Sequence, residues 1–233
     1  MLVLKSLLFG IYFLKIAKKN YFPVIFYLLL TQLVILSIPN IFLLLIFFIG
    51  YLLVSSPISI NIFRNIILDK DIIDNYMYYY NQSYTLLYMK NIMKLLFFMI
   101  AIYFLHIIIL SPFFPEDISI MTPYLYALLI YMIYIYTRVM FILPTSACEI
   151  LSGLKESYSL TKNNSIKIYL LYVCLVVPYL IINLYITNIA KNSDIQYVYL
   201  VIAILLQVIF TIFNSALIGY IYKRYCVSKI TNS

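Results

Sequence analysis

The chain has 233 residues, of which 65% are hydrophobic and only 10% are charged, and its formal net charge at pH 7 is +8. So apolar a composition leaves too little polar surface to cover a soluble globule, and we therefore expect lipid to be the main solvent. Within hydrocarbon each backbone N–H and C=O group must be satisfied inside its own segment, which excludes open strands. The sequence predicts an all-α integral membrane bundle formed as one polytopic domain over residues 1–233.

Six apolar runs follow one another along the chain, each close to the roughly 20 residues that cross a bilayer. The predicted spans are residues 21–38, 41–63, 95–114, 123–143, 168–190 and 195–222. The first is the shortest. The sixth is long enough to tilt or to extend past the membrane surface.

The basic residues indicate how these spans are oriented. Fifteen of the sixteen lysines and arginines lie in the N-terminal segment, the second-to-third and fourth-to-fifth connections, or the C-terminal tail; Lys191 is the exception. The positive-inside rule therefore predicts that both termini are cytoplasmic. The opposite connections, near 39–40, 111–122 and 191–194, are too short for an extracytoplasmic domain. Since the charges are spread over helix ends, topology and anionic lipid explain them, and we expect no nucleic-acid partner.

Composition also indicates a location. The chain is rich in Ile, Tyr, Phe, Asn and Lys and has no Trp, which is typical of an AT-rich bacterial genome, so we expect the bacterial plasma (inner) membrane. The apolar stretch 6–14 is interrupted by lysines and no small-residue cleavage site follows, so we expect no signal peptide. Two cysteines, Cys148 and Cys226, fall on the predicted cytoplasmic side and Cys174 falls in the fifth span, so no disulfide is expected.

Three cytoplasmic segments show helical spacing with a polar and an apolar face: residues 4–19, 71–87 and 149–162. Each precedes an odd-numbered span, which suggests three copies of a unit made of a surface helix and a helical hairpin. Arg64 and Arg138 are 74 residues apart, as are Ser83-Tyr84 and Ser157-Tyr158. A composition this biased produces such identities by chance, so the hypothesis depends on the shared layout of a surface helix followed by two spans. Cytoplasmic segments without helical structure would contradict it.

Two stretches resemble a recurrent pattern. Arg138-Val-Met-Phe-Ile-Leu-Pro144 and the helix Leu154-Lys-Glu-Ser-Tyr-Ser-Leu-Thr-Lys-Asn-Asn164, with Glu156, Ser157, Tyr158 and Thr161, resemble YciC-like inner-membrane proteins and the membrane domain of some glycerophosphodiester phosphodiesterases. Arg64-Asn-Ile-Ile-Leu68 is similar to a shorter form of the arginine element. The resemblance implies a fold and a membrane but no chemistry, because the catalytic part of those enzymes is a separate soluble domain.

Catalytic motifs are missing from the sequence. With one histidine and four glycines, the chain has no His-Glu-x-x-His zinc site, glycine-rich phosphate loop or nucleophile elbow. We therefore predict no enzyme activity, no cofactor and no metal. Asp69, Asp71 and Asp74 are an alternative metal-binding cluster of the kind that lipid enzymes use. We prefer to interpret these three residues as carboxylates in the first turn of a surface helix, where negative charge interacts favourably with the helix dipole.

Polar residues inside spans mark a candidate pathway. His106, in the third span, is the candidate proton relay, although a structural histidine within the bundle is the preferred interpretation. Asn183, Gln207 and Asn214 could line a solute route or simply bond between helices. We therefore expect a non-enzymatic membrane module that engages membrane lipid or a membrane protein partner. The alternative, favoured by these polar residues and by Pro178 within the fifth span, is a small-solute permease or permease subunit.

Overall fold

The computed structural model describes residues 1–37, 41–110, 118–149, 153–191 and 196–227, and every regular element in these ranges is helical, as predicted. The α-helices are α1 Leu2–Ile16, α2 Lys18–Ser37, α3 Ile41–Leu68, α4 Ser83–Leu110, α5 Ile118–Val139, α6 Ile142–Ala147, α7 Leu154–Thr161, α8 Ser165–Lys191 and α9 Gln196–Tyr222. Short turns η1 Tyr76–Asn81 and η3 Lys162–Asn164 are 3-10 helices, and η4 Lys223–Val227 is a π-helical turn.

Within the described residues, five stretches are long and apolar enough to cross a membrane: Ile46–Leu68, Ser83–Ile109, Ala127–Ala147, Leu154–Ile186 and Val198–Cys226. This confirms the prediction of a membrane-embedded, multi-pass protein. The first predicted span, 21–38, lies in α2, which is not among the five. The predicted ends at 38, 114 and 195, and most of the residues in the expected extracytoplasmic connections, lie outside the described residues.

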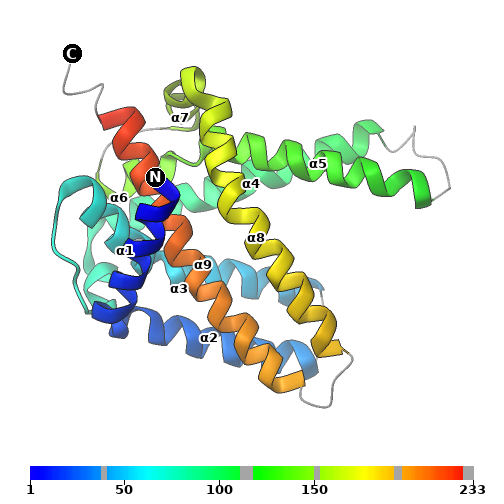
Figure 1. The fold of residues 1–233 in the computed structure, drawn as a ribbon, viewed down its shortest axis with the longest axis horizontal. Coiled ribbons are helices and arrows are strands. Elements are labelled where there is room, and N and C mark those ends of the chain that lie inside the picture. Colours follow the sequence, from blue (N-terminus) through cyan, green and yellow to red (C-terminus); the bar gives the residue numbers. More distant parts are fainter. Residues whose placement is uncertain (38–40, 111–117, 150–152, 192–195, 228–233) are drawn as a thin grey trace.

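The long helices form three pairs, α2 with α3, α4 with α5, and α8 with α9, which converge at one side of the molecule; toward the other side α4 and α5 lie apart from the other two pairs (Figure 1). The start of α1 and η4, the last described element, lie on the convergent side, together with η1, α6 and α7. Helix α9 is central, since it packs against α1, α3 and α8. The buried core is therefore concentrated where the pairs meet.

Helix α1 was expected as a surface helix over 4–19, and it instead covers Leu2–Ile16 and packs along α9. Phe13 is completely buried in this contact. At Gly10 a Cβ atom would lie 2.1 Å from the Phe213 ring, so only a residue without a side chain allows the two helices to approach this closely. One face of α1 thus belongs to the core.

The continuous surface helix expected over 71–87 is not formed. The chain leaves α3 at Asp69, which has a φ of 52°, runs without regular structure to Asn75, forms η1, and enters α4 at Ser83. The amide side chain of Asn61 bonds to both the N–H and the C=O of Ile73, so these backbone groups are satisfied without a helix. Of the third segment, 149–162, the structure shows a helix at Leu154–Thr161, and 150–152 lie outside the described residues.

Candidate functional site

Arg64 lies near the end of α3 and is only 8% exposed. Its Nη1 donates a hydrogen bond of 2.9 Å to the carbonyl oxygen of Ala147, the last residue of α6. Its guanidinium carbon lies 3.9 Å from the centre of the Tyr84 ring, and Nη1 is 3.8 Å from the Glu149 carboxylate. The charge is therefore balanced by a helix C-terminus, an aromatic face and one carboxylate.

Arg138 lies near the end of α5 and is 3% exposed. Its Nη1 and Nη2 donate to the carbonyl oxygens of Thr161 and Tyr158, at 3.3 and 3.1 Å, in the last turn of α7. Its guanidinium carbon lies 4.0 Å from the centre of the Tyr158 ring. Since the C-terminus of a helix carries partial negative charge, the arginine caps α7 and fixes it to α5.

The contact between α5 and α7 is reciprocal. Helix α5 ends at Val139, and the carbonyl oxygen of Arg138 accepts hydrogen bonds from the hydroxyls of Ser157 and Thr161. Glu156 acts at the other end of α7, where its carboxylate accepts a bond of 2.7 Å from the Gly153 N–H. The structure thus brings Ser157, Tyr158 and Thr161 of the predicted motif onto Arg138 and leaves Glu156 as a cap.

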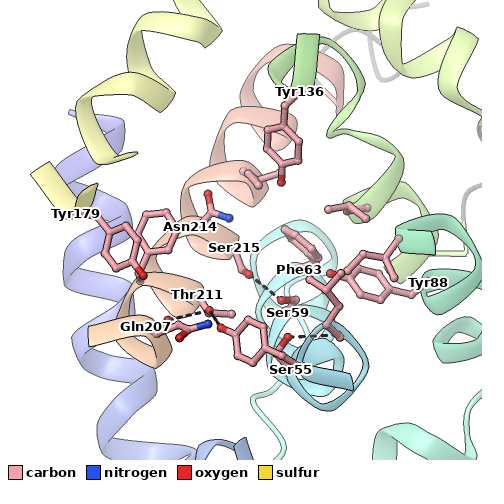
Figure 2. Close-up of a pocket in the computed structure, with 16 residues that line it drawn as sticks. Ser55, Ser59, Phe63, Tyr88, Tyr136, Tyr179, Gln207, Thr211, Asn214 and Ser215 are labelled. Atoms are coloured by element: carbon pink, nitrogen blue, oxygen red, sulfur yellow. Dashed lines mark hydrogen bonds between the residues drawn. The ribbon is translucent and has the colours of Figure 1, made fainter. Parts of the chain in front are cut away.

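A polar cavity of about 230 Å³ lies among α3, α4, α5, α6, α8 and α9, toward the interior of the bundle (Figure 2). The cavity is lined by hydroxyl, amide, aromatic and aliphatic side chains: Tyr51, Leu52, Ser55, Ser59, Phe63, Tyr88, Ile92, Tyr136, Leu143, Tyr179, Gln207, Phe210, Thr211, Asn214, Ser215 and Ile218. None of these described lining residues carries a formal charge near neutral pH. The cavity is therefore suited to an uncharged group that forms hydrogen bonds.

Two of the four predicted pathway residues line this cavity, namely Gln207 and Asn214. His106 does not, because its Nδ1 lies 2.8 Å from the carbonyl oxygen of Ile102 in its own helix and its ring packs 5.0 Å from that of Tyr131. Asn183 lies on α8, half-buried, and is not part of the lining. The four residues therefore do not form one continuous pathway.

Sequence reasoning missed the hydroxyl groups of the cavity. Ser59 on α3 and Ser215 on α9 share a hydrogen bond of 2.9 Å, and Tyr51 bonds to Thr211 beside them. Gln207, Thr211 and Ser215 recur every four residues, so they share one face of α9. This spacing was a usable signal, since a polar stripe on an apolar span faces the bundle interior.

The acidic residues 69, 71 and 74 do not gather into a metal site. Asp69 forms an ion pair with Lys223 at 2.8 Å, and Asp74 accepts a bond of 2.7 Å from the backbone N–H of Lys19 at the start of α2. Across the described ranges no group of three or more His, Cys, Asp or Glu side chains could hold a metal ion. The carboxylate of Asp74 instead stabilises a helix N-terminus.

Comparison of the chain with protein-family models, with curated proteins and with solved structures finds no match. The functional interpretation therefore depends on the residues and geometry described above.

Proposed function

We propose that the chain is a non-enzymatic, six-span module of the bacterial inner membrane that engages membrane lipid, with α2 as the additional span and both termini cytoplasmic. The observation that carries this proposal is the divergence of the α4–α5 pair from the other long helices, which it meets at one convergent, arginine-fixed end (Figure 1). Helices that diverge expose to the bilayer side chains that would be buried in a closed bundle. The resemblance to YciC-like membrane proteins, which implies no chemistry, agrees with this reading.

Helix α4 illustrates the exposed surface. Only 6% of its most apolar part is buried within the protein, and Phe97, Phe104 and Ile108 are 61%, 57% and 67% exposed. Apolar surface of this extent requires an apolar neighbour. Lipid is favoured over a protein partner because the bundle offers both an exposed apolar surface and an interior polar cavity. A lipid has a hydrocarbon chain that suits the first and a headgroup that suits the second.

The test is incubation of the purified protein with the lipid extract of its own membrane, followed by mass spectrometry of both protein and lipids. We expect lipid to remain bound after separation and the lipid composition to stay unchanged over time. Saturable conversion of one lipid into another would overturn the non-enzymatic assignment. Loss of all bound lipid with retention of a second protein would transfer the function to a protein partner.

The cavity itself favours a second candidate, a permease for a small uncharged solute, because polar groups from α3 and α9 meet inside the membrane-spanning region. Reconstituted vesicles would then show flux that falls in Gln207→Leu and Asn214→Leu variants. His106→Ala should leave that flux unchanged, since His106 bonds within its own helix away from the cavity. Vesicles that show no flux for any tested solute would count against this class.

A further inference from the structure

We propose that the polar cavity binds the headgroup of an uncharged, hydroxyl-bearing amphiphile, of the monoacylglycerol type, whose hydrocarbon chain occupies a neighbouring apolar pocket. This inference rests on the proposed lipid-engaging function and names the class of lipid. It follows from three features: the chemistry of the cavity, the position of the apolar pocket, and the hydrogen bonds that the buried arginines already make within the protein.

The cavity presents groups that suit hydroxyls. The Ser59–Ser215 pair lies at its centre, and the hydroxyl of Tyr136 points into it from α5 (Figure 2). The Oδ1 atom of Asn214 is buried and accepts no hydrogen bond from the described residues. A buried acceptor without a hydrogen bond lowers stability, so a ligand O–H that reaches it would be favoured.

An apolar pocket adjoins the cavity. Its volume is about 200 Å³ and it lies between α4, α5 and α8, lined by Met99, Met132, Ile133, Tyr136, Tyr172 and Val176. Tyr136 lines both spaces, so they share a wall. Methionine side chains adapt to ligands of irregular shape, and an alkyl chain is such a ligand. One molecule with a polar and an apolar end can fill both.

A charged headgroup does not fit this arrangement. The described lining of the cavity supplies no charged side chain, and an unpaired charge within the membrane is costly. Arg64 and Arg138, the buried cations of the convergent end, already bond to helix carbonyls and stack on tyrosines. A cavity of about 230 Å³ is also smaller than the sites of drug-sized ligands, which favours a headgroup of glycerol size.

The experiment uses the full chain in lipid nanodiscs and native mass spectrometry to count bound probe. The probes are monooleoylglycerol, monooleoyl lysophosphatidic acid with the same chain and a charged head, and free glycerol without a chain. We expect monooleoylglycerol to bind at one per protein, lysophosphatidic acid at least tenfold more weakly, and free glycerol not to compete. Equal binding of both lipids, or full competition by glycerol, overturns the proposal.

Matched variants locate the site. Asn214→Leu should weaken monooleoylglycerol binding about threefold to tenfold, as loss of one or two neutral hydrogen bonds does. Asn183→Leu, outside the cavity, should leave it unchanged. Val176→Phe fills the apolar pocket and should abolish binding, whereas the neighbouring Val177→Phe, which is 40% exposed, should not.

The outcomes separate the two proposals. The comparison of probes on the unaltered protein stands even if a variant fails to fold. Bound lipid that does not depend on Asn214 or Val176 overturns the cavity site and leaves the lipid-engaging function in place. A protein that binds neither probe and retains no lipid from its own membrane overturns both.

Discussion

The guanidinium of Arg138 lies 4.0 Å above the ring of Tyr158, twenty residues further along the chain, and caps the last turn of α7. Arg64 has the same relationship to Tyr84, also twenty residues on, at 3.9 Å. Each arginine ends a long apolar helix, and each guanidinium bonds to the carbonyl end of a short one. Two buried arginines therefore hold the convergent side of the molecule together, Arg138 through α7 alone and Arg64 through both α6 and the start of α4.

Arg138 is the first residue to test, because it holds α7 against α5. Arg138→Leu removes two charge-assisted hydrogen bonds and leaves the carbonyls of Tyr158 and Thr161 without this donor. We expect a loss of about 3 kcal/mol in the free energy of unfolding. Reversible unfolding in mixed detergent micelles would measure it. Lys155→Gln, on the exposed side of α7, is the control and should change stability by less than about 0.5 kcal/mol.

A double-mutant cycle separates the aromatic contact from the hydrogen bonds. Tyr158→Leu should cost about 1 kcal/mol when Arg138 is present and almost nothing in the Arg138→Leu background, since the cation no longer lies over the ring. Tyr158→Phe keeps the ring and should be nearly neutral. Additive effects of the two leucine substitutions would show that the stacking carries no energy.

Gly10 should tolerate no side chain, because α1 and α9 meet there. In Gly10→Ala the new methyl group would lie 2.1 Å from the ring of Phe213, so the helices must shift, at about 1–3 kcal/mol. Thermal unfolding would detect this, and a second change, Phe213→Leu, should recover part of the loss. Leu8→Ala, on an exposed face of α1, is the control. An unaltered unfolding temperature in Gly10→Ala would contradict the close packing.

Cys148 should resist alkylation in the folded protein. Burial raises the pKa of its thiol to about 12, so almost no thiolate exists at pH 7–9. A cysteine placed at the exposed position of Lys155 has an ordinary pKa near 8.5, and its labelling should accelerate through this pH range. Rates with a small maleimide, in a background without the other cysteines, would test this. Equal rates for both positions would show that Cys148 is accessible.

The same Lys155→Cys variant tests orientation. The basic residues predict a cytoplasmic α7, so an impermeant maleimide should label this cysteine in inverted membrane vesicles and not in intact cells. A cysteine at Ser6, buried in α1, serves as a negative control in both preparations. Labelling of the variant in intact cells would reverse the topology.

The sequence was sufficient to predict the class of fold, because the apolar runs are long and hydrocarbon allows few alternatives. It did not reveal that residues 69–81 form no continuous helix. Their apolar spacing is helical, but Asn61 satisfies the Ile73 backbone from another element, and this contact between elements is invisible in local periodicity. The prediction of a surface helix at 71–87 was therefore wrong, whereas Arg64 and Arg138 each stack on a tyrosine twenty residues further along the chain.

The candidate site was predictable in part. Gln207 and Asn214 were identified because amides on an apolar span are conspicuous. Ser59 and Thr211 were not, since single hydroxyl groups are common in membrane helices and gain meaning only when α3 and α9 meet. His106 was identified for its chemistry, but its partner is the carbonyl of Ile102 in the same helix.

Native mass spectrometry of the protein, extracted gently from its own membrane, is the decisive test of whether the chain binds a lipid, since it detects lipids, solutes and protein partners alike. We predict one uncharged, hydroxyl-bearing lipid per chain, retained by the unaltered protein and by Asn183→Leu and depleted in Asn214→Leu. A bare chain, or one that carries only a small polar solute, would contradict it and favour the permease.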